Sequence, residues 1–154
     1  MKDKLILFIA MGFGLGKMPV APATFGSLLG IPIFILAGKN HLLYIEICIL
    51  ATILGIYIAH IAEKITGIKD DRKIVVDEVV GFLITMIGIP VEIFYIIMGF
   101  FIFRIIDILK PPPICLLQKA SGGFGIVLDD ILAGIIGCII LNIIVRCQYL
   151  YLLF

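Results

Sequence analysis

Apolar segments alternate with polar ones along the whole of this 154-residue chain. None of the apolar segments shows a sustained two-residue alternation, which would be typical of strands with one buried face. Each is also long for a strand, so the pattern predicts helices throughout. The segments occupy residues 5–11, 28–37, 42–62, 79–103 and 131–145, and an apolar tail follows at 150–154.

The lengths of these segments decide which of them can cross a bilayer. At about 1.5 Å per residue, residues 28–37 are too short for a hydrocarbon layer of ~30 Å, whereas residues 42–62 are long enough. Residues 79–103 are interrupted by Gly88 and Pro90, which predicts two half-length helices or one sharply kinked helix. We therefore expect an all-α, compact multi-helix membrane-associated bundle with short and broken apolar helices, formed by a single domain over residues 1–154.

Composition indicates contact with lipid. Hydrophobic residues make up 62% of the chain, charged residues only 15%, and the mean hydropathy is +1.25, which departs from the balance of soluble domains. The net charge of +1 gives no attraction to nucleic acid. The four cysteines are scattered, which argues against a zinc site or a disulfide framework. The N-terminus resembles a secretory signal peptide, but Asp3 and Lys17 argue against that interpretation.

The polar segments at 12–27, 66–78 and 104–130 hold most of the charge. If the apolar segments come in pairs, these three polar segments lie on one membrane face. Their basic residues are Lys17, Lys69, Arg72, Lys73, Arg104, Lys110 and Lys119, with Lys64 at an edge. The only basic residues in the connections on the opposite face, at 38–41 and 88–92, are Lys39 and His41. The positive-inside bias then predicts that the shared face is cytoplasmic.

Acidic residues are few and unusually placed. Asp77 and Glu78 precede one apolar run, Asp129 and Asp130 precede another, and Asp107 lies within an apolar stretch. For Asp129 and Asp130, the favourable interaction of a carboxylate with the dipole at a helix start explains one acid well and two adjacent acids poorly. Adjacent carboxylates in partly apolar surroundings repel each other, and a divalent cation removes that repulsion. We therefore expect these five acids to be metal ligands and catalytic groups, with helix capping as the alternative.

Basic side chains lie beside one of these acids. Arg104, Asp107 and Lys110 follow one another at three-residue intervals, so that Arg104 and Asp107 share a helix face. A simple intrahelical ion pair is one interpretation of this spacing. In the other, Asp107 binds the metal while Arg104 and Lys110 hold phosphate oxygens. The proline run at 111–113 is expected to end this helix.

Two further segments could approach a ligand. Residues 24–27, ahead of an apolar helix, are typical of an N-cap region whose free amides receive an anion, so Thr24 and Ser27 are candidate substrate-binding residues. Residues 121–125 are rich in glycine and are interpreted as a flexible approach to Asp129 and Asp130. A plain loop explains the second segment equally well.

Missing motifs narrow the chemistry. The chain lacks the Cys-x5-Arg loop of cysteine-dependent phosphatases, and its two histidines, His41 and His60, are isolated. No covalent nucleophile stands out. The residues therefore favour hydrolysis by metal-activated water, with the cation also balancing charge on the transferring oxygens.

Four blocks of the sequence resemble the phosphatidylglycerophosphatase A family, in that family's order and over most of the chain. They are GLG with PVAPATFGS at 14–27, Asp70 with IVVDEVVG at 74–81, FRIIDILKP with PI at 103–114, and GGFGIVLDD with AG at 122–134. The resemblance implies an all-helical fold and Mg²⁺-dependent hydrolysis of phosphatidylglycerophosphate to phosphatidylglycerol and phosphate. It further implies a bacterial inner membrane location, with the active site facing the cytoplasm and membrane lipid as a partner.

By position in these blocks, the resemblance implies that the site residues are Asp77, Glu78, Arg104, Asp107, Lys110, Asp129 and Asp130. The sequence departs from the family at Ala23, where glycine is usual. A positive φ at that position would strain the turn.

Other functions stay open at this stage. A phosphohydrolase on the same scaffold could act on another lipid phosphate or on a soluble phosphomonoester, although the high apolar content favours a lipid. A small ion transporter would place carboxylates near the middle of its spans, whereas most here lie at span ends beside basic residues. An inert assembly subunit would leave the acid clusters unexplained.

Overall fold

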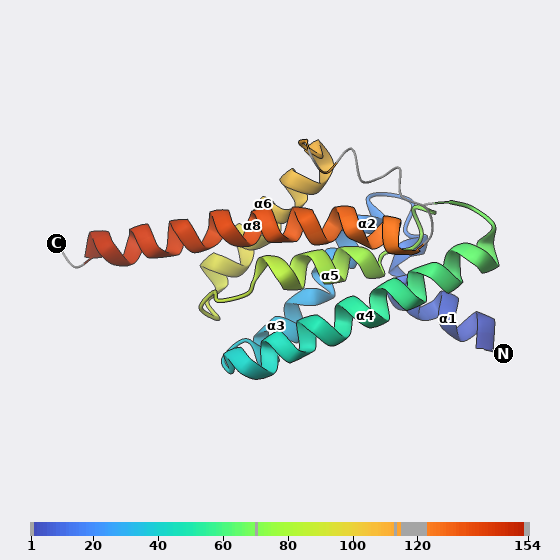
Figure 1. The fold of residues 1–154 in the computed structure, drawn as a ribbon, viewed down its shortest axis with the longest axis horizontal. Coiled ribbons are helices and arrows are strands. Elements are labelled where there is room, and N and C mark those ends of the chain that lie inside the picture. Colours follow the sequence, from blue (N-terminus) through green and yellow to red (C-terminus); the bar gives the residue numbers. More distant parts are fainter. Residues whose placement is uncertain (1, 70, 113, 115–122, 153–154) are drawn as a thin grey trace.

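The computed structural model describes residues 2–69, 71–112, 114 and 123–152. No strand occurs among these residues, which confirms the prediction of an all-α fold (Figure 1). In chain order the elements are α1 (Lys2–Ala10), the 3-10 helix η1 (Gly12–Lys17), α2 (Pro22–Leu28), α3 (Gly30–Ala37), α4 (His41–Thr66), α5 (Val76–Thr85), α6 (Ile93–Leu109) and α8 (Gly123–Leu152).

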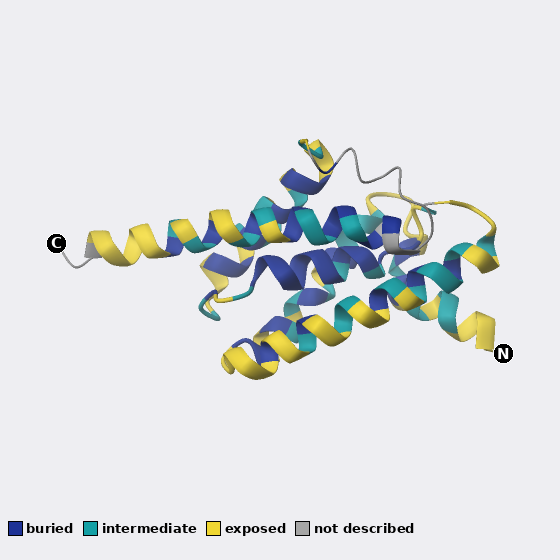
Figure 2. Cartoon of the chain, in the orientation of Figure 1, coloured by how far each residue is buried: buried dark blue, intermediate teal, exposed yellow. Residues whose placement is uncertain are grey.

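The short helix α5 lies at the centre of the bundle, where α2, α3, α4, α6 and α8 all pack against it (Figure 1). Nearly all of its residues are buried, as Figure 2 shows. Phe82 and Leu83 of α5 form the core together with Phe103 of α6 and Leu141 of α8. Because neighbouring helices enclose α5, the first turn of this helix has a fixed position.

The chain breaks between α5 and α6 where the sequence predicts it. Gly88 has a φ of 78°, and Pro90 follows before α6 begins. The break leaves the carbonyl of Ile87 without a partner in a continuing helix, and this oxygen accepts a hydrogen bond of 3.0 Å from the Asn142 amide on α8. In apolar surroundings this bond offsets the cost of an interrupted helix.

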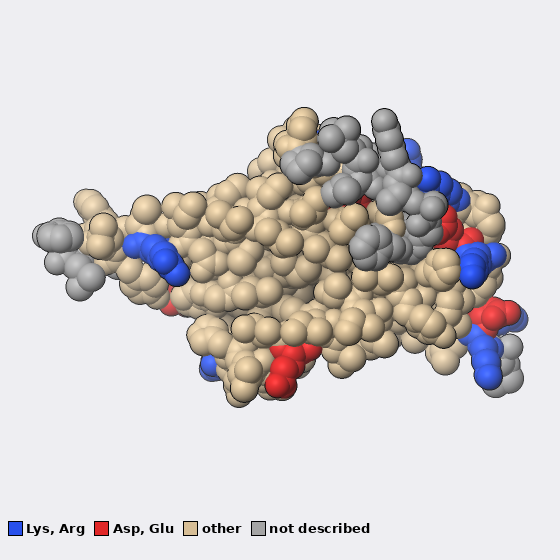
Figure 3. Space-filling view, in the orientation of Figure 1, with Lys and Arg blue, Asp and Glu red and all other residues tan. Residues whose placement is uncertain are grey.

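Two helices, α4 and α8, are long and apolar enough to cross a membrane, over His41–Thr66 and Val127–Tyr151. Their outward faces expose large apolar side chains such as Ile53, Tyr57 and Ile139. In Figure 3 charged side chains gather toward the ends of the molecule and leave a broad uncharged zone between them. The protein is thus a membrane-associated bundle in which α3 and α5 are too short to cross alone.

Glycines bring α5 and α8 into close contact. A Cβ atom on Gly81 of α5 would lie 2.8 Å from the backbone oxygen of Asp130 and 2.5 Å from the Phe103 ring. A Cβ atom on Gly134 of α8 would lie 2.5 Å from the carbonyl oxygen of Gly81. Backbone atoms cannot move aside as a flexible side chain can, so this spacing between the two helices requires glycine.

Candidate active site

A cavity of about 670 Å³ opens where α5 begins and α6 ends. All five acids and both basic residues that the sequence analysis selects line this cavity. The complete lining is Pro22, Ala23, Asp71, Arg72, Ile74, Asp77, Glu78, Arg104, Asp107, Ile108, Lys110, Asp129 and Asp130.

Three carboxylates from three helices lie close enough together to share one cation. Oxygens of Glu78 on α5, Asp107 on α6 and Asp130 on α8 lie within 4.8 Å of one another. These residues are only 8%, 7% and 3% exposed. All three donors are carboxylate oxygens, which suits a hard divalent cation, and three buried negative charges repel one another without one. The geometry therefore defines a carboxylate cluster able to hold a metal ion.

Asp77 and Glu78 reach the cavity because they form the first turn of α5. The Oδ1 atom of Asp77 accepts a hydrogen bond of 3.0 Å from the backbone N–H of Glu78. This bond satisfies one of the amides that a helix start leaves without a partner. Both carboxylates also face the positive end of the helix dipole. Helix-start chemistry therefore contributes to the position of this pair.

The same explanation does not apply to Asp129 and Asp130. Helix α8 begins at Gly123, so these two acids lie in its second turn, beyond the reach of capping. The expectation of a flexible approach or loop is wrong from residue 123 onward, because packing of α8 against α4, α5 and α6 overrides the low helix propensity of its glycines. Residues 121 and 122 lie outside the described part of the chain, as do Asp70 and Pro113.

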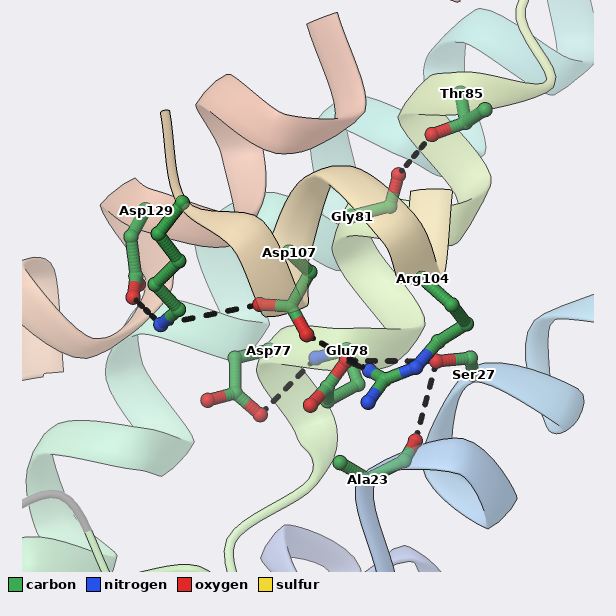
Figure 4. Close-up of polar contacts among 10 residues, drawn as sticks. Ala23, Ser27, Asp77, Glu78, Gly81, Thr85, Arg104, Asp107 and Asp129 are labelled. Carbon is green, nitrogen blue, oxygen red and sulfur yellow. Dashed lines mark hydrogen bonds and ion pairs between the residues drawn. The ribbon is translucent and has the colours of Figure 1, made fainter. Parts of the chain in front are cut away.

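Two cations join the carboxylates of the three helices (Figure 4). The Nη1 atom of Arg104 pairs with Glu78 of α5 and lies 2.9 Å from Oδ2 of Asp107 on its own helix. The Nζ atom of Lys110 lies 2.5 Å from Oδ2 of Asp129 and 3.8 Å from Oδ1 of Asp107. The intrahelical pair of Arg104 and Asp107 exists, but both cations also reach carboxylates on another helix. A simple intrahelical ion pair therefore does not account for them.

Lys110 reaches two helices because the chain turns at its position. Helix α6 ends at Leu109, as the following prolines predict, and Lys110 adopts a φ of 42°. Its backbone N–H donates a hydrogen bond of 2.8 Å to the carbonyl of Ile106. This left-handed cap is unfavourable for a residue other than glycine, and here it directs the ammonium group toward the acids.

The electrostatics of the site favour charged Lys110 and leave Glu78 open to protonation. Burial is the main cause that raises the pKa of Glu78 to about 7, and the negative charge of Asp107 adds to it, while Arg104 opposes the rise. Burial lowers the pKa of Lys110, but the hydrogen bond and charge of Asp129 outweigh it, so that this pKa is raised. A cation bound between the carboxylates would favour the ionised form of Glu78.

The N-cap predicted at 24–27 is wrong. Helix α2 begins earlier, with Ala21 as its N-cap and a proline as its first residue, because proline is pre-organised for a helix start. The Ser27 hydroxyl is buried and lies 3.4 Å from Oε2 of Glu78. Among the described residues, neither Thr24 nor Ser27 lines the cavity, so their roles in substrate binding stay predictions.

Ala23 does not strain the chain. It lies within helix α2, and the positive φ of this region belongs to Ala21, at 48°. Alanine at position 23 is therefore compatible with the backbone.

Asp71 and Arg72 also line the cavity, although no sequence pattern predicts them there. Both lie between α4 and α5, shortly before Asp77, and Arg72 is exposed. A run of mixed charges before a helix is indistinguishable from a solvated loop in sequence. Their proximity to Asp77 along the chain is the one signal that was present.

The fold and the cavity define a membrane-associated helical protein with a site of carboxylates and cations at the end of its apolar helices, as an enzyme acting on an anionic lipid requires. The sequence matches the phosphatidylglycerophosphatase A family over residues 8–145. The chain belongs to this family, whose members are phosphoric monoester hydrolases.

Three relatives align over most of their length. Phosphatidylglycerophosphatase A of Escherichia coli (strain K12) is 39% identical over 139 residues, which cover 88% of this chain and 81% of the relative. The protein of the same name from Haemophilus influenzae is 39% identical over 142 residues, which cover 88% of this chain and 85% of the relative. A Bacteroides thetaiotaomicron protein, provisionally named phosphatidylinositol-3-phosphatase, is 35% identical over 148 residues. These residues cover 90% of this chain and 92% of the relative. No solved structure matches the chain.

Proposed function

We propose that the protein is a magnesium-dependent phosphatase that hydrolyses phosphatidylglycerophosphate to phosphatidylglycerol and inorganic phosphate. One observation carries this proposal: Glu78, Asp107 and Asp130 converge from three helices in a cavity that Arg104 and Lys110 also line. Membership of the family and the names of the Escherichia coli and Haemophilus influenzae relatives support this substrate.

Glu78, Asp107 and Asp130 are the residues that would hold the cation, because their oxygens lie closest together. Mg²⁺ prefers oxygen donors and usually combines one or two carboxylates with waters and substrate phosphate. When bound, it would supply Lewis-acid charge that polarises the phosphoryl group and makes water a stronger nucleophile.

Arg104 and Lys110 bind the substrate phosphate in this proposal. The Nε atom of Arg104 is buried and has no hydrogen-bond partner among the described residues, so the guanidinium is not fully paired by the protein. Lys110, kept cationic by Asp129, adds a point charge on the other side of Asp107. Both charges offset the negative charge of the phosphoryl oxygens in the transition state.

Hydrolysis forms a bond from a water oxygen to phosphorus and breaks the bond from phosphorus to the glycerol oxygen, which takes up a proton. Asp77 and Asp129 line the cavity outside the three-carboxylate cluster. We therefore assign to this pair the transfer of a proton from water and its return to the leaving oxygen.

A lipid can reach the cavity from the side of α6. Ile108 lines the cavity and is nevertheless 69% exposed, and Ile105 and Leu109 beside it are also exposed. This apolar edge allows acyl chains to stay in the bilayer while the headgroup enters the site. The bacterial relatives support a location in a bacterial inner membrane. The exposed basic residues of the segment between α4 and α5 support a cytoplasmic side for the cavity.

A phosphoinositide is the second candidate substrate, and the Bacteroides thetaiotaomicron relative favours it. Both lipids carry a phosphomonoester on a polyol headgroup, so the cluster and its cations suit either. Discrimination between them then depends on the outer part of the cavity.

Phosphate release from a panel of substrates tests the proposal. The panel contains phosphatidylglycerophosphate, phosphatidylinositol 3-phosphate and soluble glycerol 3-phosphate, each with Mg²⁺ or with a chelator. We expect the fastest release from phosphatidylglycerophosphate with Mg²⁺, its loss with the chelator, and its recovery when Mg²⁺ is restored. Equal rates with glycerol 3-phosphate would contradict a lipid substrate. Ion flux in proteoliposomes without any phosphate release would favour a transporter.

Arg72→Gln is expected to raise KM for phosphatidylglycerophosphate with little change in kcat. Arg72 lines the cavity and is exposed, and we place the phosphodiester of this lipid beside it. Loss of an exposed charged contact predicts an increase of about three- to tenfold. Initial rates over a range of substrate concentrations measure both constants.

Lys73→Gln is the matched control for this variant. Lys73 is the next residue and is equally classed as exposed, but it does not line the cavity. An equal rise in KM in both variants would indicate a general effect of charge and remove the assigned role of Arg72.

A further inference from the structure

The N-terminal segment carries an exposed apolar surface that the proposed reaction does not use. Phe8 of α1 is 50% exposed and Phe13 of η1 is 64% exposed, and their rings stack edge to face with centroids 5.6 Å apart. Leu5 and Val20 nearby are also exposed. This surface differs from the lipid-facing sides of α4 and α8, because basic residues accompany it.

Phe13 occupies an unfavourable backbone conformation. Its φ is 58°, and the glycines on both sides, Gly12 and Gly14, also have positive φ values of 55° and 101°. Such a conformation is strained for a bulky residue, and strain of this kind persists at functional sites. The fold gains little burial from it, since Phe13 stays 64% exposed. An apolar environment outside the chain would compensate for this cost.

A second cavity, of about 350 Å³, is lined by Phe8, against whose ring Phe13 packs. Its lining residues are Lys4, Leu7, Phe8, Met11, Gly14 and Lys17. Lys4 and Lys17 are exposed and take part in none of the ion pairs found among the described residues. The cavity thus combines an apolar floor with two cations, which suits a ligand with an anionic group and an apolar chain.

This segment is fixed to the framework that carries the carboxylates. The carbonyl of Ala10 accepts a hydrogen bond of 2.9 Å from the N–H of Val75, two residues before Asp77. A Cβ atom on Gly16 would lie 2.0 Å from the carbonyl of Lys73, so the backbones are in direct contact. Figure 1 shows α1 at the end of the molecule where α4 ends and α8 begins. Residues that follow α4 and residues near the start of α8 also line the catalytic cavity.

We propose that α1 and η1 form a docking site for an anionic phospholipid of the surrounding bilayer. The ammonium groups of Lys4 and Lys17 hold the phosphate, and Phe8 and Phe13 insert between the acyl chains. A phospholipid fits better than a soluble anion, because a soluble anion has no use for the two exposed rings. This site is separate from the catalytic cavity and does not depend on the proposed reaction.

The chain contains no tryptophan, so Phe13→Trp introduces a single tryptophan at the proposed site, whose emission is excited selectively over that of the tyrosines. The full-length variant is placed in nanodiscs that contain brominated phosphatidylglycerol or brominated phosphatidylcholine. We expect the tryptophan emission to be shifted to the blue and to be quenched by bromine. Quenching by the anionic lipid should be at least about twofold stronger, since each lysine enriches anionic lipid around itself about fivefold. Ile68→Trp is the control, because Ile68 is 55% exposed in the segment after α4 and should stay in water.

The double substitution Lys4→Gln and Lys17→Gln, in the Phe13→Trp background, tests the charge. It should make quenching by the two lipids equal while leaving the catalytic rate with a detergent-dispersed substrate unchanged. Emission of Phe13→Trp as red and as unquenched as that of Ile68→Trp would overturn the docking site. A preference for the anionic lipid that survives the loss of both lysines would overturn the assigned phosphate contacts. Because quenching requires no turnover, these outcomes are independent of the catalytic proposal.

Discussion

Asp130→Asn is expected to lower kcat/KM for phosphatidylglycerophosphate by about 10²- to 10³-fold. The substitution keeps the shape of the side chain but removes one of three carboxylates that lie within 4.8 Å of one another. Two effects should appear together. Mg²⁺ should no longer raise the melting temperature, because stabilisation by a ligand requires binding to the folded state. The metal-free variant should be at least as stable as the parent, since repulsion between buried charges falls. Phosphate release and thermal unfolding, each with and without Mg²⁺, measure these effects.

Asp71→Asn is the matched control for this prediction. Asp71 lines the same cavity but does not belong to the cluster, so its variant should keep activity within about threefold, as expected for a partly exposed charge. Full activity and full Mg²⁺ stabilisation in Asp130→Asn would remove the cluster from the proposed mechanism. A loss of activity with normal stabilisation by Mg²⁺ would assign Asp130 to proton transfer in place of metal binding.

The parts of the fold that follow local rules could be predicted from the sequence. Gly88 and Pro90 indicate the break between α5 and α6, and the prolines after Lys110 indicate the end of α6. Local rules failed where packing or a competing local signal decided the outcome. Helix α8 includes the glycines at 123 and 125 and packs against three other helices, and α2 begins at Pro22 rather than at Thr24.

The membership of the site was easier to predict than its geometry. Adjacent acids in apolar surroundings, together with the family blocks, selected seven residues that all line one cavity. No sequence pattern indicated that Glu78, Asp107 and Asp130 form the closest group. That grouping depends on how three helices cross, because each helix contributes one member. Arg72 could not be predicted as a lining residue, because a charged residue in a loop follows no helical spacing that would indicate which way it faces.

The crossing of α5 and α8 is therefore the feature on which the cluster depends, and Gly134→Ala tests it. The added Cβ would lie 2.5 Å from the carbonyl oxygen of Gly81, one helical turn from Glu78. Alanine in place of glycine favours a helix by up to ~1 kcal/mol, whereas overpacking costs about 1–3 kcal/mol, so the clash should prevail. We expect a lower free energy of unfolding. We also expect about a 10²-fold loss of kcat, because a small increase in the distance between Glu78 and Asp130 misplaces the groups of the site. Thermal unfolding and steady-state kinetics in nanodiscs measure both quantities.

Gly137→Ala provides the comparison that separates the crossing from a general effect of alanine in α8. Gly137 lies one turn further along the same helix, and the nearest atoms to its added Cβ belong to side chains, those of Thr85 at 3.1 Å and Ile102 at 3.6 Å. A side chain can yield where a backbone carbonyl cannot, so the gain in helix propensity should nearly balance the contact. This variant should retain most of the activity and its response to Mg²⁺. If Gly134→Ala lost stability but kept kcat and Mg²⁺ binding, the position of Asp130 relative to Glu78 would not limit catalysis. Equal losses in both variants would mean that α8 tolerates no added volume on this face, and the close approach at Gly81 would have no special role.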